Sequence, residues 1–450
     1  MSNQLPSNTV TLIVFHNDLR VLDNAALSKA AELSSAGRLL LVYAPSLTDG
    51  LDLQADYVHD TLGEARQQFM LESVADLNAA LSQRGNRLLY LQGDVKTSNT
   101  LSQLSTLIER HNVTNICVSN TADYNQNRVY DRLRIQHPQL HWHVEVTASL
   151  FDELPLDELP KSFTQFRKKI EANFDLLKAE TDRAISSAPD ILAPLPESML
   201  HEDNSRFEVP TIHQRTMDKQ PSLETGFEGG EASGLQHLQG YFDSEAPSTY
   251  KITRNSLDEW TDSTKFSAWL ANGSLSVHMV LNRLRQYERD VVANDSTYWI
   301  WFELLWREYF YWYAVTHQQK LFWFKGIGQH TPTTQLNPHR LQQWQNGKTA
   351  YPIVNACMHQ LNTTGYMSNR GRQLVASCFI HELGLDWRYG AAYFEQQLVD
   401  YDVASNWGNW QYLAGVGADP RGSRQFNLDK QTQQYDPNGD FIKRWQPNGL

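Results

Sequence analysis

Five short apolar runs alternate with helical stretches over the first 150 residues, and this alternation constrains the fold more than any other feature of the chain. The apolar runs are Val10–Phe15, Leu39–Ala44, Leu88–Leu91, Ile116–Val118 and Trp142–Val146, and the helical stretches include Asn24–Ser34, Glu64–Gln83 and Leu101–His111. Strands that alternate with helices favour a doubly wound parallel sheet, in which ligands bind at the carboxyl ends of the strands. Those ends here carry His16–Arg20 and Asn120–Tyr124.

The rest of the chain divides into an irregular segment and a helical one. Residues 151–234 contain many prolines and end in the Gly/Glu-rich stretch Glu224–Gly234, which indicates a linker, with one helix expected over Thr164–Lys178. The later pattern is helical, as in Val277–Tyr287, Thr297–Thr316 and Gly371–Leu383. We expect an α/β domain over residues 1–150, a wrapping linker over 151–234 and an all-α domain over 235–450.

Composition excludes several classes of protein. Only three cysteines occur, which excludes a disulfide scaffold, a zinc site built on a CxxC pair and a four-cysteine iron–sulfur cluster. The 15 histidines have no metal-ligand spacing, so we expect no metal site. No apolar run approaches the roughly 20 residues that span a bilayer, and Met1–Val10 is not a secretory signal. A cytoplasmic protein without membrane contact is expected. The net charge of −12 argues against coating nucleic acid but allows a local basic groove.

Tryptophan is concentrated in the helical part, where 12 of the 13 lie after residue 250. On the helix expected over 297–316, Glu303, Trp306, Arg307 and Phe310 follow the spacing i, i+3, i+4, i+7 and therefore share a face. A carboxylate, an indole and a guanidinium on one stripe are not usual for a core face, and together with the other polar segments of this domain they indicate a functional site. The alternative is a core helix whose Glu–Arg pair is a surface ion bridge.

Other polar segments of the helical part add to this candidate site. Ser263–Ser267 offers three hydroxyls and an ammonium near an expected helix start, which suits a diphosphate, although a simple helix cap is the commoner use of such residues. Asn369–Arg372, Asp400–Asp402 and Asn406–Trp410 follow later in the chain.

The longer motifs resemble the photolyase/cryptochrome flavoprotein family. They are Phe15–Asn24, Tyr250–Asn255, Ser263–Leu270, Phe302–Phe310, Thr349–Arg372, and the segment from Asp386–Arg388 through Asp400–Asp402 to Gly415–Arg421. The resemblance covers nearly the whole chain and is weakest over 160–230. Thr253–Asn255, Tyr366, Gly371 and Gly415–Arg421 resemble the DASH cryptochromes of this family. The resemblance implies a sheet domain that carries an antenna pigment and a helical domain that binds FAD.

The resemblance also implies where FAD would lie. Its diphosphate and ribityl part would lie along Tyr250, Ser263, Thr264, Lys265, Phe266 and Ser267. Arg307 and the Arg372–Asp400 pair would lie along the isoalloxazine, and Asp402 would contact the flavin or adenosine side. Asn406 would face the reactive central nitrogen of the ring, where an amide accommodates either protonation state and so fits a fully reduced, electron-donating flavin.

The reaction implied by the resemblance is light-driven repair of cyclobutane pyrimidine dimers. Glu303 would hydrogen-bond the pyrimidine edge and stabilise the dimer radical anion, and Trp306 would pack on the dimer. Asn369 and Arg370 would complete the pocket and reach backbone phosphate. No histidine occurs in Gly365–Arg372, so repair of 6-4 photoproducts, which would need an acid–base histidine there, is not expected.

Two tyrosines predict which DNA is repaired. Tyr366 and Tyr412 stand where photolyases active on duplex DNA have tryptophan. Stacking of a base on an aromatic side chain contributes about 1–3 kcal/mol, and flipping from a duplex costs a similar few kcal/mol. A weaker aromatic wall therefore favours dimers in single-stranded DNA. Whether duplex DNA is repaired at all stays open at this point.

A second chromophore and other functions are also implied. DASH proteins commonly hold methenyltetrahydrofolate between the domains, and Asp123 stands where a carboxylate would hold the pterin. A solvated loop aspartate is the alternative, and His16 departs from the arginine usual at its position. The alternative functions are a photoreceptor that signals through its flavin, made less favoured because the chain stops at Leu450 without a long tail, and a nucleic-acid-binding regulator. We expect a monomer.

The electron relay of the family usually contains three tryptophans between flavin and surface. Trp410 and Trp387 match the proximal and middle positions, whereas the distal position falls on Thr334. Trp323 or Trp344 could replace it, or the relay is shorter, or these two are packing residues.

We therefore expect Trp410→Phe to lose flavin photoreduction under blue light, because the proximal donor is removed. The measurement is the bleaching of oxidised flavin absorbance, with Trp142→Phe in the α/β part as the control. Normal photoreduction in Trp410→Phe would contradict the predicted relay.

Overall fold

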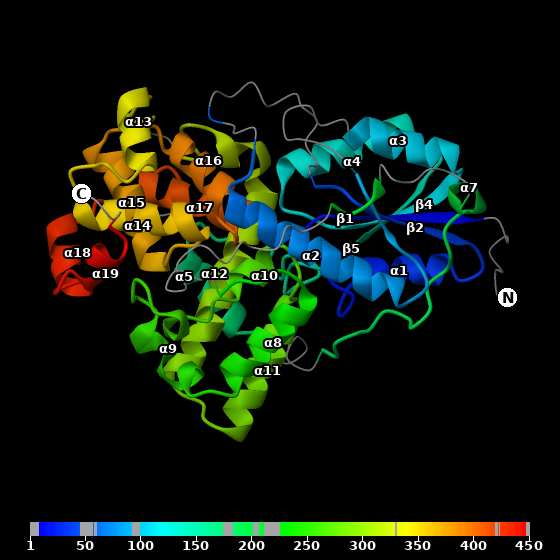
Figure 1. The fold of residues 1–450 in the computed structure, drawn as a ribbon, viewed down its shortest axis with the longest axis horizontal. Coiled ribbons are helices and arrows are strands. Elements are labelled where there is room, and N and C mark those ends of the chain that lie inside the picture. The colour runs from blue at the N-terminus through cyan, green and yellow to red at the C-terminus, as the bar shows by residue number, and fades with distance from the viewer. Residues whose placement is uncertain are drawn as a thin grey trace.

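The structure is a computed structural model that describes residues 9–45, 57, 61–91, 100–173, 183–200, 207–210, 226–328, 331–418, 422 and 424–446. A sheet domain and a helical domain lie side by side (Figure 1). The sheet has five parallel strands in the order β3-β2-β1-β4-β5, which confirms the predicted doubly wound sheet. The strands are β1 (Val10–Phe15), β2 (Arg38–Tyr43), β3 (Leu88–Tyr90), β4 (Val113–Ser119) and β5 (His141–Glu145).

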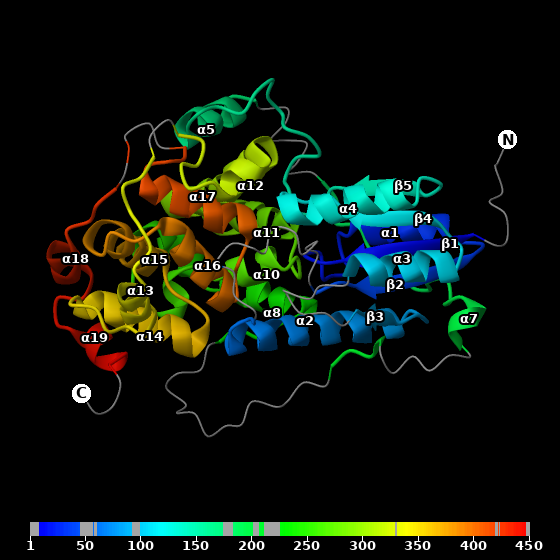
Figure 2. The same cartoon turned by 90° about the horizontal axis from the view of Figure 1, so that it is seen from above.

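Helices cover both faces of this sheet (Figure 2). They are α1 (Ala25–Leu33), α2 (Glu64–Ser82), α3 (Thr100–Arg110) and α4 (Tyr124–Gln136). The strands read as apolar runs because alternate residues meet opposite layers: Leu12 and Val14 pack with α3 and α4, and Ile13 and Phe15 with α1 and α2. Strands β1 and β4 are neighbours at the point where the strand order reverses, so the segments after them meet at one edge.

Two linker expectations are corrected by the structure. The linker helix α5 spans Phe163–Glu171, and Asn173 closes its last turn with a bond to Ile170 O, so the helix ends well before Lys178, which itself lies outside the described residues. A short helix α7 follows at Glu197–Leu200. Helix α8 already begins at Glu231, inside the stretch expected as linker, because the backbone N–H groups of Glu231 and Ala232 are bonded to Asp76.

The helical domain confirms the expected all-α architecture. Its helices are α8 (Glu231–Phe242), α9 (Ala246–Thr253), α10 (Ser267–Ala271), α11 (Val277–Asp290), α12 (Asp295–His317), α13 (Pro338–Gln345), α14 (Pro352–Thr364), α15 (Asn369–Ser377), α16 (Trp387–Gln397), α17 (Val403–Ala414), α18 (Leu428–Tyr435) and α19 (Asp440–Arg444). Short 3₁₀ turns lie at Trp260–Asp262 and Gln318–Phe322. The helix expected over Gly371–Leu383 is α15 followed by a π-helical turn at Cys378–Glu382.

The long helix α12 runs through the domain and begins at a capping box formed by Asn294 and Thr297. Glu308, in its middle, is fully buried and accepts bonds from Leu150 N at 2.9 Å and Trp312 Nε1 at 2.7 Å. The start of the linker is thereby attached to α12, and α12 in turn supplies one wall of the site.

A buried arginine joins the two domains. Arg20 is 1% exposed, and its guanidinium donates to the carbonyls of Thr147 at 2.8 Å and Gly273 at 3.0 Å. Glu231 accepts from Val21 N and Leu22 N. Arg20, predicted only as part of a strand-end ligand segment, therefore has a structural role between the domains.

Candidate functional site

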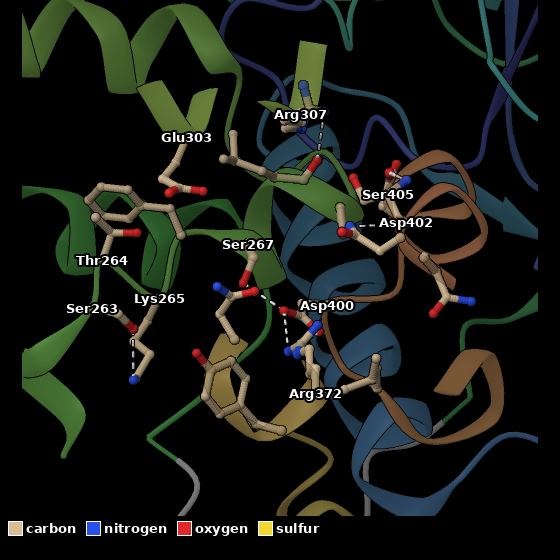
Figure 3. A pocket seen from close by; sticks show the side chains of 18 of the residues that line it. Ser263, Thr264, Lys265, Ser267, Glu303, Arg307, Arg372, Asp400, Asp402 and Ser405 are labelled. Atoms are coloured by element: carbon tan, nitrogen blue, oxygen red, sulfur yellow. Dashed lines mark hydrogen bonds and ion pairs between the residues drawn. The ribbon is translucent and has the colours of Figure 1, made fainter. Parts of the chain in front are cut away.

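An open cavity lies between α12, α15, α17 and the segment before α10, with an empty volume of about 1470 Å³ that includes open solvent (Figure 3). The predicted residues that line it are Tyr250, Ser263, Thr264, Lys265, Phe266, Ser267, Glu303, Arg307, Tyr366, Asn369, Arg372, Asp400, Asp402, Asn406 and Trp410. The structure places five other predicted residues outside this lining, namely Asp123, Trp306, Arg370, Trp387 and Tyr412.

The hydroxyl segment forms one end of the cavity. Lys265 adopts a φ of 55°, and its ammonium donates to Ser263 Oγ at 2.9 Å. Helix α10 begins after Phe266 and has no side-chain cap, and the Ser267 hydroxyl donates to Asp400 Oδ2 at 2.7 Å instead. The hydroxyls therefore do not act as the simple helix cap that the sequence left open. Lys265, Ser263 and Thr264 supply a cation and hydroxyl donors, a set that suits an anionic ligand.

An ion pair between the partly buried Arg372 and the buried Asp400 lines the cavity. Arg372 donates to both carboxylate oxygens of Asp400, at 2.8 and 3.0 Å, and to Met367 O at 2.8 Å. Both bonds to Asp400 come from Nη2 and the bond to Met367 O comes from Nε, and together they fix the orientation of the guanidinium. The predicted pairing of these two residues is present in the structure.

Helix α17 carries the polar residues on the far side. Asp402 caps this helix by accepting from Ser405 N at 2.7 Å. Asn406 lies one turn later, is 9% exposed and donates from Nδ2 to Ala391 O at 2.9 Å, which fixes the orientation of its amide. The helix approaches α12 closely because Gly408 has no side chain: a Cβ there would come within 2.4 Å of the Phe310 ring.

Glu303 is paired with an arginine that sequence reasoning missed. Arg254 Nη2 donates to Glu303 Oε1, and Trp299 Nε1 donates to the same oxygen at 3.2 Å. Burial raises the pKa of the Glu303 carboxyl, and the Arg254 guanidinium opposes this rise. Arg254 follows Tyr250 by one helical turn, and this spacing was the signal available in the sequence.

Arg307 does not form the surface bridge to Glu303 that was the alternative interpretation. Its guanidinium donates to Ala148 O at 2.6 Å and Leu270 O at 3.3 Å. Arg307 thus has one face on the cavity while it bonds to the backbone of the other domain.

The aromatic wall differs from the expectation. Trp306 meets Tyr412 edge to face at 6.1 Å, whereas Tyr366 lies beside the cations of Lys265, at 4.9 Å, and Arg372, at 5.4 Å. The two tyrosines therefore have different surroundings: Tyr366 lines the cavity, whereas Tyr412 does not line it and lies beside Trp306. Only Tyr412 adjoins Trp306.

Arg370 does not line the cavity. Its guanidinium lies 4.7 Å over the Tyr435 ring and donates to Asn255 Oδ1 at 3.2 Å and Gln431 Oε1 at 3.4 Å. That Arg370 completes the substrate pocket and reaches backbone phosphate stays a prediction, and in this structure its guanidinium is engaged by α18 and Asn255. Asn369, its neighbour, lines the cavity as expected.

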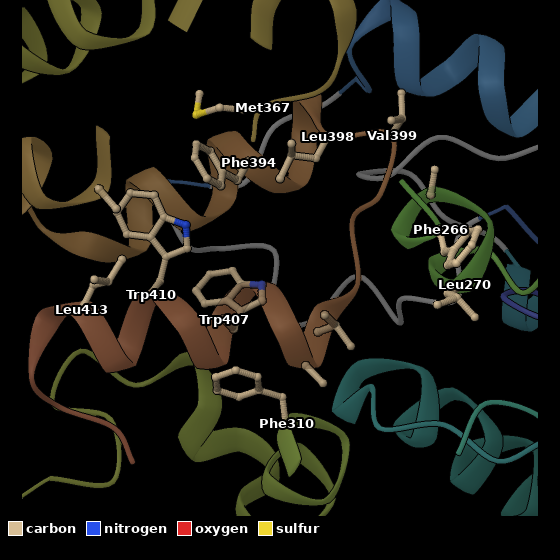
Figure 4. Close-up of a cluster of buried hydrophobic side chains, with 14 of the residues drawn as sticks. Phe266, Leu270, Phe310, Met367, Phe394, Leu398, Val399, Trp407, Trp410 and Leu413 are labelled. Carbon is tan, nitrogen blue, oxygen red and sulfur yellow. The ribbon is translucent and has the colours of Figure 1, made fainter. Parts of the chain in front are cut away.

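Of the two predicted relay tryptophans, Trp410 lies in the cluster of buried apolar side chains on α17 (Figure 4). Trp410 also lines the cavity and is 2% exposed, and Trp387 is fully buried with its indole N–H bonded to Phe324 O at 2.9 Å. Trp344 contacts Trp410 at 6.3 Å but is fully buried, so it cannot be a surface end of a relay. Trp323 is 39% exposed.

A second cavity lies where the carboxyl ends of β1 and β4 meet the helical domain, with an empty volume of about 610 Å³ that includes open solvent. Arg307 and Asp402 line both cavities. Three buried polar atoms that line the second cavity, Asn120 Oδ1, Gln126 Oε1 and Thr147 Oγ1, have no hydrogen-bond partner among the described residues. A ligand with N–H or O–H groups would satisfy them.

Asp123 lies directly after Ala122, which lines this second cavity. Its Oδ1 caps α4 by accepting from Asn125 N at 2.8 Å and Gln126 N at 3.4 Å, and burial raises the pKa of its carboxyl. The side chain is therefore not a freely solvated loop aspartate. His16 contacts Ala44 O through Nδ1 at 2.8 Å, and burial lowers its pKa.

Two searches bear on other classes of function. Within the described ranges, no group of three or more His, Cys, Asp or Glu side chains is placed to hold a metal ion. None of the helices that the structure describes is long and apolar enough to cross a membrane.

Comparison with known proteins gives matches over most of the chain. Residues 11–187 match the family model of DNA photolyase, and residues 299–449 match that of the FAD binding domain of DNA photolyase. Cryptochrome DASH of Vibrio parahaemolyticus is 51% identical over 442 residues, covering 97% of this chain and 93% of that protein. A cryptochrome structure from Synechocystis aligns with a TM-score of 0.83 at 35% identity, covering 99% and 89% of the two chains. A class III photolyase structure from Agrobacterium tumefaciens aligns with a TM-score of 0.77 at 25% identity, covering 99% and 88%.

The pairing of Glu303 with Arg254 predicts an effect on titration. In Arg254→Met we expect the pKa of Glu303 to rise further, because burial then acts without the opposing cation. Infrared difference spectra over a pH series, with Arg254→Met/Glu303→Gln subtracted to isolate the Glu303 carboxyl, measure the midpoint.

Lys251→Met is the matched control, since Lys251 lies on the same helix but pairs with Asp295 at 2.9 Å. Its midpoint should equal that of the unmodified protein. An equal midpoint in Arg254→Met would mean that Arg254 does not hold the carboxylate in its charged form.

Proposed function

This chain belongs to the photolyase/cryptochrome family and, within it, to the DASH cryptochromes, and from that membership we propose that it repairs cyclobutane pyrimidine dimers under blue light, preferentially in single-stranded DNA. One observation carries the proposal: Glu303, a substrate-side carboxylate, and Asn406, a flavin-side amide, line the same continuous cavity. A ligand bound at Asn406 and a base bound at Glu303 would therefore share one space.

The chemistry of the cavity fits FAD. Lys265 with Ser263 and Thr264 would hold the diphosphate, and the Arg372–Asp400 pair would lie along the isoalloxazine. Asn406 would face the central ring nitrogen with its amide fixed by Ala391 O. When bound, FAD supplies the light-driven one-electron donation that splits the cyclobutane ring, after which the electron returns.

Glu303 would recognise the flipped dimer. The Arg254 guanidinium favours the charged form of its carboxylate, which would accept a hydrogen bond from a pyrimidine ring N–H. Trp306 and Tyr412, which meet edge to face, would form the apolar side of the substrate site. A flipped base held between a polar edge contact and an aromatic contact is the usual arrangement for enzymes that act on extruded bases.

The position of Tyr412 supports the single-strand preference. It is the one ring of the two predicted that adjoins Trp306, and a phenol offers less stacking area than an indole. A contribution of about 1–3 kcal/mol per stacked base would then offset less of the few kcal/mol that flipping from a duplex costs. Single-stranded DNA avoids much of that cost.

We further propose methenyltetrahydrofolate as the antenna, held by Asp123 at the interdomain edge. The second cavity beside it shares Arg307 and Asp402 with the main cavity, so a pigment there would lie close to the flavin. Its unpartnered polar atoms support a polar, hydrogen-bonding occupant.

The repair proposal predicts a difference between matched oligonucleotides. Reduced protein under blue light should repair a dimer in a single strand at least about tenfold faster than in the duplex, which corresponds to about 1.4 kcal/mol of uncompensated flipping cost. Glu303→Gln, which keeps the shape but loses the charged acceptor, should slow single-strand repair roughly tenfold to a hundredfold.

Each other outcome has a defined meaning. Equal repair of the single-stranded and the duplex oligonucleotide would support repair activity and contradict the single-strand preference argued from Tyr412. If protein with a photoreducible flavin repairs neither the single-stranded nor the duplex oligonucleotide, the result would favour the light-sensing alternative.

The antenna proposal predicts the effect of Asp123→Asn. Asparagine caps a helix as well as aspartate does, so α4 should remain intact and stability should change by less than about 0.5 kcal/mol. Loss of the carboxylate should lower the folate content of the purified protein. Unchanged folate content, measured by extraction and absorbance, would contradict a role of Asp123 in holding the pterin.

A further inference from the structure

We infer that Phe163, on the linker helix α5, is a positioning residue that fixes the Trp306 indole in the orientation in which it meets a pyrimidine dimer. The inference rests on the proposed function, because it names a further part of the same substrate site. Neither the sequence motifs nor the composition of the linker pointed to this residue.

The contact between the two rings is the basis of the inference. Their centroids are 3.7 Å apart and their planes differ by 14°, which is closer than any other aromatic pair in the described part of the chain. Phe163 is 5% exposed, and its ring also meets Phe302 edge to face at 5.1 Å. One face of the indole is therefore covered by a ring that is itself enclosed.

Helix α5 is attached to α12 so that Phe163 cannot easily withdraw. Arg167 Nη1 donates to Tyr298 OH at 3.2 Å, and the same hydroxyl donates to Glu171 Oε1 at 2.7 Å. Arg167 also lies 5.4 Å over the Phe302 ring. These contacts follow Phe163 along α5 and hold the helix across the outer face of α12.

Stacking is the interaction that orients Trp306. Among the described residues, no hydrogen bond holds its indole N–H, whereas Trp344 donates to Val375 O at 3.0 Å and Trp387 to Phe324 O at 2.9 Å. The other rings near Trp306 are Phe310, near-parallel at 5.4 Å, and Tyr309 and Tyr412, both edge-on at 6.1 Å. A helical tryptophan has more than one allowed χ1 rotamer, so removal of the closest ring frees the indole to turn.

A freed indole would weaken recognition of the lesion. In a variant without the Phe163 ring, binding of the dimer would have to order the Trp306 side chain. The unmodified protein already holds this side chain in place before the dimer binds, so the variant would lose preorganisation. The aromatic pair is expected to be worth about a two- to tenfold change in affinity. The effect should fall on binding of the dimer and not on the repair yield per photon once the dimer is bound.

The test compares Phe163→Leu, with Phe163→Met as a second variant, against Phe163→Tyr, which keeps the ring. Phe166→Leu is the matched control, because Phe166 lies one turn further on α5 and is fully buried, but its ring contacts Tyr309 and not Trp306. Holoprotein of each variant is titrated with a single strand that contains one dimer and with the same strand without damage. The Kd for the undamaged strand divided by the Kd for the strand with the dimer measures recognition of the lesion.

We expect Phe163→Leu to lower this ratio two- to tenfold, and Phe163→Tyr and Phe166→Leu to keep it. A second readout is independent of DNA: in protein labelled with 5-fluorotryptophan, the ¹⁹F resonance of Trp306, assigned with Trp306→Phe, should shift or broaden in Phe163→Leu alone.

The outcomes separate the two proposals. A wild-type protein that binds both strands equally would overturn the proposed function and this inference with it. A wild-type protein that discriminates, with an unchanged ratio and an unchanged Trp306 resonance in Phe163→Leu, would overturn this inference alone.

Discussion

The attachment of α12 to the backbone of the segment that leaves the sheet domain is the interaction on which the rest of the structure depends. Arg307 donates to Ala148 O, and the buried Glu308 accepts from Leu150 N. Two adjacent charged side chains, which point to different sides of the helix, thus replace the solvent that these backbone groups would otherwise need. Because Arg307 also donates to Leu270 O, the same helix sets the position of α10 and of the hydroxyl segment before it.

This attachment explains why the site can be built on one rigid helix. A turn before Arg307, Glu303 faces the cavity, and Trp306 projects to its flank against Phe163 of the linker. Residues 148–171 therefore act on the site from behind α12, first through the backbone at Ala148 and then through the ring of Phe163. The linker is part of the support of the site as well as a connection between domains.

The parts of the fold and site that depend on local pattern could be predicted from the sequence. Short apolar runs that alternate with helical stretches predicted the sheet, and the helical pattern predicted α12, on which the i, i+3, i+4 spacing placed Glu303, Trp306 and Arg307 on one stripe. The partners of these residues could not be predicted, because they come from elements that are distant in sequence. Arg254 reaches Glu303 only through the packing of α9 on α12.

The dependence on elements that are distant in sequence also explains why the surroundings of Arg370 and of the two tyrosines could not be predicted. Arg370 follows a cavity residue directly, but its direction depends on where α18 lies, and Tyr435 and Gln431 of that helix enclose it. Tyr366 and Tyr412 were grouped because both stand where photolyases active on duplex DNA have tryptophan. A sequence pattern does not show which parts of a cavity two side chains adjoin. That depends on how the segment before α15, which carries Tyr366, packs relative to α17, which carries Tyr412.

Charge in the cavity shows how an acidic chain can hold anionic ligands. The chain carries −12 overall, yet the cavity lining contains four cations and three carboxylates, a local balance of 4 − 3 = +1. The cations are Arg254, Lys265, Arg307 and Arg372, and the carboxylates are Glu303, Asp400 and Asp402. Arg254 and Arg372 are engaged by Glu303 and Asp400, and Asp402 caps α17, so Lys265, bonded to a neutral hydroxyl, is the cation best placed for a diphosphate. Salt and water screen the charges on the distant surface, whereas groups that line the pocket act on a ligand at short range. The local balance of charge, and not the net charge, therefore decides which ligands the site favours.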